Sequence, residues 1–171
     1  MPKIIQNLRE QLLAETQKQI AVRGYASTTV RSVANACGVG VGTVYNYFET
    51  KEMLVASFVL EKWKTYLDAM ATLPSDDPRC LLAGIYDLMK RFAVENVSLF
   101  SDPDATKQMA LGSPSRHKML RAQIAAYVLP ICEGEAAQFA AEFIAEALIA
   151  WSMENADFEA VYPLLKKIIQ K

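Results

Sequence analysis

Residues that bind metals or form disulfides are scarce in this chain of 171 residues. It contains one histidine, His117, and three cysteines, Cys37, Cys80 and Cys132. The cysteines are odd in number and lie far apart, which argues against a disulfide framework. One histidine among scattered cysteines gives no zinc-ligand spacing. We therefore expect a reduced protein with no metal and no cofactor.

Long apolar runs are also missing. No stretch approaches the roughly 20 apolar residues that a bilayer-spanning helix requires. The first residues, MPKIIQNLREQLL, follow an amphipathic pattern and lack an apolar core followed by a cleavage site. We expect a cytoplasmic protein that does not associate with membranes.

An excess of basic charge is absent too. The net charge of −1 excludes a polycation that coats nucleic acid non-specifically. The charge is unevenly distributed, however: residues 1–51 hold six Lys/Arg against three Glu, whereas the remainder holds 12 basic and 16 acidic residues. A basic segment on an acidic body can approach phosphates selectively.

Motifs of enzymes are not found. The sequence has no nucleophile elbow, phosphate-binding loop or metal-ligand spacing. His117 lies among charged residues in SPSRHKM, where a solvated side chain is the simpler expectation. The sequence therefore favours a protein that is not an enzyme.

What the sequence does contain is helical periodicity throughout, with no alternation typical of strands. It predicts an all-α fold of about nine helices: an N-terminal three-helix module over residues 1–49 and a helical domain over residues 50–171. The segment LPSDDP at 73–78 is predicted to be a loop. The expected helices cover about 3–23, 29–37, 40–48, 50–72, 79–100, a short one from 101, 112–131, 135–153 and 156–170.

The most informative segment is GYASTTVRSVANACGVGVGTVYNYFETK, residues 24–51. Thr28 or Thr29 can cap a first short helix, because a hydroxyl accepts a hydrogen bond from an unpaired helical N–H group. Gly38 can end this helix in the left-handed conformation, and a second helix starts near Gly40. Two short helices joined by a glycine turn are typical of a helix-turn-helix, which places its second helix in the major groove of DNA.

The same residues resemble the DNA-binding module of the TetR family of bacterial repressors. The pattern G-Y-x-x-T-T-V-R-x-V-A-x-x-x-G-V-x-x-G-T-V-Y-x-Y-F-x-x-K-E is specific and covers about a third of the chain, whereas the rest matches only in helical pattern. The resemblance implies a homodimeric repressor of a palindromic operator that a small ligand releases from DNA. Activation is also compatible with it, because the sign of regulation depends on where the operator lies.

The resemblance also implies roles for individual residues. Thr29 matches a phosphate contact, Arg31 matches a position that reaches a guanine edge in some relatives, and Thr43, Tyr47 and Lys51 match phosphate-binding positions. Few groove-facing side chains carry hydrogen-bonding groups, so we expect specificity to depend on Arg31 and on DNA shape. The predicted DNA-binding residues are Thr28, Thr29, Arg31, Gly40, Val41, Gly42, Thr43, Tyr45, Asn46, Tyr47 and Lys51.

Aromatic and methionine side chains recur in the middle of the chain, where TetR relatives bind their inducers. Such side chains suit an adaptable apolar pocket, although at helical spacing each can equally be plain core. No charged residue stands out as an anchor, which favours a mainly apolar ligand. The predicted ligand-binding residues are Phe58, Trp63, Tyr66, Met70, Tyr86, Met89, Phe92, Met109, Met119 and Tyr127.

The last two expected helices are candidates for a dimer interface. The segment AAQFAAEFIAEALIAW combines large apolar residues with alanines that allow close helix packing, so it can form a four-helix interface between two chains or an intrachain core. The predicted dimerisation residues are Phe139, Phe143, Ile144, Ala147, Leu148 and Trp151.

Two alternatives of the same fold remain open. One is a redox-sensing regulator that uses Cys80 or Cys132, although neither belongs to a paired motif. Cys37 occupies an expected core position of the hairpin, where burial explains it. The other is a helical dimeric interaction protein that does not bind DNA.

Overall fold

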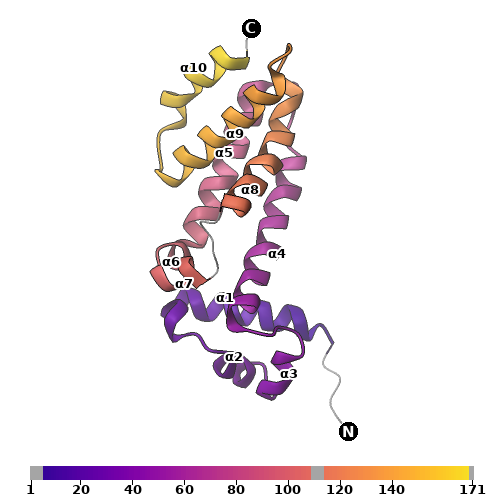
Figure 1. Cartoon of the computed structure of the whole chain (residues 1–171), viewed down its shortest axis with the longest axis vertical. Helices are drawn as coiled ribbons and strands as arrows, with labels where there is room; N and C mark the ends of the chain where they lie inside the picture. Colours follow the sequence, from indigo (N-terminus) through magenta and orange to yellow (C-terminus); the bar gives the residue numbers. More distant parts are fainter. Residues whose placement is uncertain (1–5, 109–113, 170–171) are drawn as a thin grey trace. The chain divides into compact units, whose positions relative to one another are not determined.

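The computed structural model describes residues 6–108 and 114–169 (Figure 1). Over these residues it contains helices and no strands, which confirms the predicted all-α class. There are ten α-helices and one short 3-10 helix in the described ranges: α1 Leu8–Ser27, α2 Val30–Ala36, α3 Val41–Tyr45, α4 Lys51–Ala71, α5 Pro78–Glu95, α6 Val97–Phe100, α7 Pro103–Gln108, α8 Pro114–Val128, η1 Leu129–Ile131, α9 Ala137–Met153 and α10 Phe158–Ile169.

The helices group into two compact units that do not follow the predicted boundary after residue 49. Among the described residues, the first unit holds 6–63 and 96–108, and the second holds 64–95 and 114–169. The beginning of α4 and the short helices α6 and α7 therefore belong with the N-terminal helices. Helical periodicity marks the helices but carries no information on which of them pack together.

The first unit has one apolar core beneath its three N-terminal helices. Leu12 and Val33 are fully buried there, together with Val44 on α3 and Val55 on α4. The short helices α6 and α7 pack against α1 and contribute Leu99 and Ala105 to this core. The core thus joins segments that are distant in the sequence.

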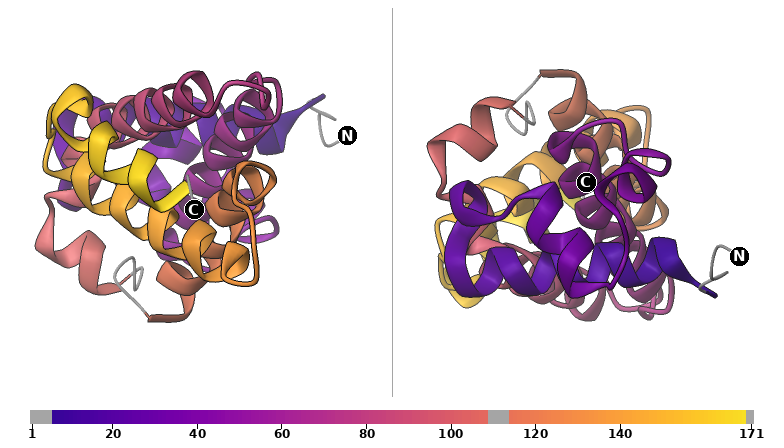
Figure 2. Two further views of the ribbon diagram at one scale, coloured as in Figure 1. Left: turned by 90° about the horizontal axis from the view of Figure 1, so that it is seen from above. Right: turned by 90° about the horizontal axis from the view of Figure 1, so that it is seen from below.

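The second unit is built around α9, which packs on α5, α8 and α10 (Figure 2). Its core residues Leu82, Ile124 and Leu148 are fully buried. The hydroxyl of Tyr86 on α5 donates to the carbonyl of Trp151, 3.0 Å away, and also contacts the carbonyl of Ala156 where α9 leads into α10. These contacts satisfy two carbonyls at the end of α9.

Three predicted helix boundaries need correction. The expected helix over 79–100 is interrupted at Asn96. This buried residue lies between the end of α5 and the start of α6. The helix expected to reach residue 131 changes to a 3-10 turn at Leu129, next to Pro130, because proline cannot donate the helical hydrogen bond. The second hairpin helix ends at Tyr45 rather than near Phe48. None of the helices in the described residues is long and apolar enough to cross a membrane.

Candidate DNA-binding site

The start of α2 is held by a capping box. Thr29 Oγ1 accepts from the N–H of Ser32 at 3.0 Å, and Ser32 Oγ accepts from the N–H of Thr29 at 3.1 Å. Gln19 on α1, only 4% exposed, ties this turn to the first helix, with Nε2 donating to the Ser32 carbonyl at 3.1 Å. The sequence predicted Thr29 as a cap of this helix, but it did not predict the roles of Ser32 and Gln19. The capping-box pattern usually has Glu or Gln in the place of Ser32, which is why it was missed.

The turn between α2 and α3 is made by Gly38, whose φ of 67° lies in the left-handed region that favours glycine. The N–H of Val39 donates to the carbonyl of Ala34 at 3.0 Å, which closes the end of α2. Ala34 itself is fully buried, so α2 can approach its neighbours closely. The predicted helix-turn-helix is thus present with the predicted glycine at its turn.

Inward and outward faces are clearly separated on α3 and the residues that follow it. Val44 and Phe48 are buried at 0% and 3% exposure, whereas Tyr45 and Tyr47 are 49% and 48% exposed. Phe48, and not Tyr47, therefore packs into the core of the first unit. Both tyrosine residues therefore keep surface that an external partner can reach.

The exposed residues of α2 and α3 make a polar surface on the helix-turn-helix. Thr29, Arg31, Gly40, Gly42 and Asn46 are exposed. Val41 and Thr43 are half-buried. Nine of the eleven predicted DNA-binding residues thus keep exposed surface on the helix-turn-helix and its flanking turns, namely Thr29, Arg31, Gly40, Val41, Gly42, Thr43, Tyr45, Asn46 and Tyr47.

Thr28 and Lys51 make contacts within the first unit that the sequence did not predict. Thr28 is 1% exposed and its hydroxyl donates to the carbonyl of Gly24 at 2.9 Å, so it holds the end of α1 instead of facing outward. Lys51 is half-buried and its Nζ donates to the carbonyl of Tyr25 at 2.6 Å. Both side chains are engaged within the first unit, and sequence spacing alone does not distinguish inward from outward residues at the ends of short helices.

Tyr25 stands at the centre of a polar network inside the first unit. Its side chain is buried, and its hydroxyl lies 3.1 Å from Glu52 Oε1 and 3.1 Å from Gln108 Oε1. Burial, assisted by the Glu52 carboxylate, raises the pKa of Tyr25 to about 12. Hydrogen bonds from backbone N–H at the start of α4 lower the pKa of Glu52. The network therefore keeps the phenol neutral and the carboxylate ionised.

The predicted ligand-binding residues do not gather in one unit. Phe58 and Trp63 belong to the first unit, and the other described ones belong to the second. Met109 lies outside the described residues. Most serve as core: Phe58, Trp63, Met70, Tyr86 and Met89 are buried, Tyr66, Phe92 and Tyr127 are half-buried, and Met119 is 49% exposed.

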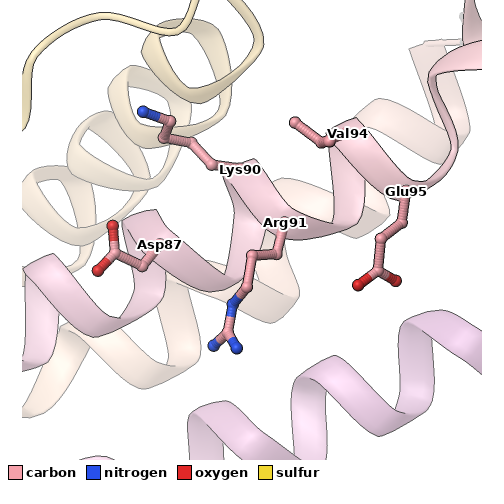
Figure 3. Close-up of a pocket in the computed structure, with 5 residues that line it drawn as sticks. All are labelled: Asp87, Lys90, Arg91, Val94 and Glu95. Atoms are coloured by element: carbon pink, nitrogen blue, oxygen red, sulfur yellow. The ribbon is translucent and has the colours of Figure 1, made fainter.

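A surface hollow on α5 is lined mainly by charged side chains (Figure 3). Asp87, Lys90, Arg91, Val94 and Glu95 line it, and Arg91 and Glu95 extend from the same side of the helix. Nearby, Tyr66 hydrogen-bonds Glu95 and meets the Phe92 ring edge-on at 5.3 Å. None of the five lining residues was among the predicted ligand-binding residues, which were chosen for apolar character.

The predicted dimerisation stripe divides into two faces of α9. Ile144 and Leu148 are fully buried in the second unit, so their part of the prediction corresponds to intrachain core. Phe139 and Phe143, in contrast, are 74% and 51% exposed. Ala147 and Trp151 are half-buried between these faces. Met153 at the end of α9 and Leu164 on α10 are two further exposed apolar residues of the second unit.

His117 is paired rather than simply solvated. Its Nε2 lies 2.8 Å from Glu146 Oε2, and Arg121 lies 3.8 Å from the same oxygen. These side chains link α8 to α9, with His117 hydrogen-bonded to the Glu146 carboxylate beside Arg121. Over the described part of the chain, no group of three or more His, Cys, Asp or Glu side chains is arranged to hold a metal ion.

The fold and this surface define a helical protein with an N-terminal helix-turn-helix, as in DNA-binding regulators. The family described as "Bacterial regulatory proteins, tetR family" matches residues 12–58, which span α2, α3 and their flanking helices. The match is confined to these residues, so the N-terminal module is similar to that of the TetR family of bacterial regulators.

Individual proteins are similar either to the N-terminal module or to the fold of the whole chain. An HTH-type transcriptional regulator of Bacillus subtilis, YerO, is 33% identical over 49 residues, which cover 29% of this chain and only 17% of YerO. Two solved structures share the fold across nearly the whole chain: the TetR family repressor AlkX from Dietzia sp. (18% identity, 95% of this chain and 97% of AlkX, TM-score 0.62) and the fatty acid degradation regulator FadR from Bacillus halodurans (18%, 98% and 96%, 0.59).

Proposed function

We propose that this protein is a cytoplasmic, non-enzymatic regulator that binds a palindromic DNA operator as a homodimer and is released by a small, mainly apolar ligand. The observation that carries the proposal is the outward face of the helix-turn-helix. Polar groups of Thr29, Arg31 and Tyr45 are exposed there, while Val44 and Phe48 anchor the same helices in the core. Repression is the expected sign of regulation.

DNA contacts are assigned from this face. Thr29 lies at the N-terminus of α2, where the helix dipole favours a phosphate. The Arg31 guanidinium can bond two acceptors of a guanine edge, and Val41 can touch a thymine methyl group. Thr43 and Tyr47 are proposed to contact phosphates, while Gly40, Gly42, Tyr45 and Asn46 face the groove. With so few base-reading side chains, DNA shape supplies part of the specificity.

Dimerisation is assigned to the outward face of α9 and to α10. Phe139 and Phe143 are large, exposed and one helical turn apart, and exposed aromatic side chains of this kind mark interaction surfaces. A two-fold dimer through this face presents two recognition helices to one duplex, which a palindromic operator requires.

The apolar character of the ligand is inferred from two structural relatives and from the side chains of the second unit. Two structural relatives carry names connected with apolar compounds: AlkX is implicated in biodegradation of n-alkanes, and FadR is a fatty acid degradation regulator. The buried aromatic and methionine side chains of the second unit, such as Met70, Tyr86 and Met89, are compatible with an apolar ligand.

A redox-sensing regulator is less well supported. The Asp77 carboxylate accepts from the Cys80 thiol and raises its pKa, and burial raises the pKa of Cys132. Both environments disfavour the thiolate, which is the reactive form. An interaction protein that does not bind DNA is separated from our proposal by the following experiment.

Selection of bound sequences from random duplex DNA, with purified protein at moderate salt, tests the proposal. We expect an inverted repeat with two half-sites separated by one helical turn or a multiple of it. Recovery of no sequence by wild-type protein, after any co-purified ligand has been removed by unfolding and refolding, would contradict DNA binding.

Arg31→Ala then tests the proposed base contact. We expect a loss of about 1–3 kcal/mol per contact and a relaxed base preference at one position in each half-site. The measurement is a second selection with the variant, together with its affinity for the selected duplex. A uniform loss over all sequences would instead make Arg31 a phosphate ligand.

A further inference from the structure

One buried amide connects α1 to the start of α2. Gln19 on α1 is 4% exposed, and its Nε2 donates to Glu15 Oε1 at 2.7 Å and to the Ser32 carbonyl at 3.1 Å. Its Oε1 accepts from the Ser32 hydroxyl at 2.6 Å. Both amide hydrogens and the amide oxygen are therefore engaged, as a polar group buried this deeply requires.

The partners of Gln19 determine which way its amide points. The two groups next to Nε2, the Glu15 carboxylate and the Ser32 carbonyl, are acceptors without a hydrogen of their own. A reversed amide would place its oxygen against both of them, with no hydrogen between. The amide oxygen therefore faces Ser32 Oγ, and the Ser32 hydroxyl must be the donor in that contact.

Ser32 transmits this arrangement to the residue that caps α2. A hydroxyl has one hydrogen, so when Ser32 donates to Gln19 its oxygen can only accept from the N–H of Thr29, 3.1 Å away. The other acceptor near the Ser32 hydroxyl is the Thr29 carbonyl at 2.8 Å, which already accepts from the N–H of Val33 at 3.1 Å. Gln19 thus keeps the capping box in one hydrogen-bonding arrangement.

The capping box in turn leaves the Thr29 hydroxyl ready to donate outward. Thr29 is exposed, and its Oγ1 accepts from the N–H of Ser32 at 3.0 Å, which fixes the position of the oxygen. Within the described residues, no hydrogen bond uses the hydrogen of this hydroxyl. A fixed oxygen with a free hydrogen is what the proposed phosphate contact of Thr29 requires.

We propose that Gln19 is a positioning residue for DNA binding, which acts through Ser32 to hold the Thr29 hydroxyl in place for a phosphate. This inference rests on the proposed DNA binding and on the phosphate contact assigned to Thr29. A hydroxyl that is held in position before binding has less freedom to lose when it meets the duplex, so the buried amide strengthens a contact made by another residue.

Duplexes with one neutral phosphate provide the test. In the selected duplex, we would replace one phosphate at a time by a methylphosphonate, which lacks the charge and one acceptor oxygen. The loss of affinity at each replacement maps the phosphates that the wild-type protein contacts. Thr29→Val, which removes the hydroxyl and keeps the branched shape, identifies the phosphate of Thr29 as the one whose replacement no longer matters. Thr29→Ser, which keeps the hydroxyl, should retain the wild-type map.

Gln19→Met, an unbranched apolar side chain of similar length, should weaken binding about tenfold, the order of one hydrogen bond to a charged group. Its map should lose the effect at the Thr29 phosphate and keep the effects at all others. Ser32→Ala, which removes the hydroxyl between the two residues, should give the same map, and the double variant should bind no more weakly than either single one. If Gln19→Met does not fold, Ser32→Ala decides the test.

A matched control is Gln17→Met, the same change at a half-buried position of α1, which should bind and map as wild type does. The inference is overturned if either folded variant, Gln19→Met or Ser32→Ala, binds as wild type does. Weaker binding by the same factor on every duplex would also overturn it, because that result indicates a purely structural role.

The proposed function and the inference fail in different ways. If Thr29→Val leaves the wild-type map unchanged, Thr29 contacts no phosphate, and the inference is overturned while DNA binding stands. If the wild-type protein binds no duplex at all, the proposed function fails and the inference fails with it.

Discussion

Tyr25 makes contacts through its ring, its carbonyl and its hydroxyl within the first unit. Its ring supports the Lys51 ammonium, its carbonyl accepts two hydrogen bonds, and its hydroxyl meets Glu52 and Gln108. Gln108 is the last residue of α7, so the hydroxyl also links this short helix to α4. Its side chain is 2% exposed and belongs to the apolar core of the first unit. Its partners were not predicted, because they lie up to 83 residues away.

The raised pKa of Tyr25, about 12 against an ordinary 10.0, predicts a loss of stability in alkali. Unfolded tyrosine releases its proton near pH 10, whereas the folded residue holds it until about pH 12, so the unfolded state binds fewer protons in between. The stabilisation is complete below pH 10 and is lost as the pH rises through 12. Urea unfolding of wild type and Tyr25→Phe between pH 8 and about 12 should show a smaller decline in the variant.

Tyr66 offers a comparison, since burial and Glu95 also raise its pKa to about 12. Tyr66→Phe should remove a separate part of the alkaline decline, and the double variant should combine both effects because the two residues lie in different units. The prediction for Tyr25 is contradicted if the difference in unfolding free energy between wild type and Tyr25→Phe is the same at every pH.

Among the helices, α3 is the one whose composition is least typical. It is five residues long, starts after Gly40 and contains Gly42. Gly42 has an ordinary helical φ and nothing lies within 4 Å of an added Cβ, so neither backbone conformation nor packing requires glycine there. Gly38 differs, because its φ of +67° does require it.

We therefore expect opposite effects from the two matched changes. Gly42→Ala should stabilise the free protein by about 0.4–1 kcal/mol, because alanine restricts the unfolded chain. It should nevertheless weaken operator binding, if the exposed backbone of α3 approaches the duplex closely. Gly38→Ala should destabilise by about 1–2 kcal/mol, because a Cβ is unfavourable in the left-handed region. Urea unfolding and titration with the selected duplex provide both measurements, and unchanged operator affinity in Gly42→Ala would argue against close backbone approach.

Interactions between near neighbours in the sequence could be predicted, whereas those between distant segments could not. The cap of α2 and the turn after it were predicted, because Thr29 and Gly38 act through residues a few positions away. The helix over 79–100 was predicted too long, since the break at Asn96 allows Leu99 to enter a core formed by other segments. Sequence periodicity gives apolar faces but not their partners, so buried Leu148 and exposed Phe143 looked alike.

At the scale of the whole molecule, the exposed face of α9 predicts the oligomeric state. Phe143→Ser should shift the protein from dimer to monomer and keep its helical circular dichroism, because Phe143 is 51% exposed in the single chain. Analytical ultracentrifugation over a range of concentrations provides the measurement. Operator affinity should fall with the dimer.

Two controls make this prediction specific. Ala126→Ser, at an exposed position of α8, should remain a dimer. Leu148→Ala, at a fully buried position, should instead lower the unfolding free energy of the chain by about 2–5 kcal/mol. A Phe143→Ser protein that sediments like wild type would place the interface elsewhere.

The division of the chain into units has a consequence for protein engineering. Because α6 and α7 contribute Leu99 and Ala105 to the N-terminal core, the first unit is discontinuous in sequence, and residues 64–95 form an insertion within it. A gene fragment that ends at Trp63 would encode an incomplete fold with part of its apolar core uncovered. Chimeric proteins that exchange the second unit should therefore be joined at three sites, near residues 63, 95 and 108, so that α6 and α7 stay with the helix-turn-helix.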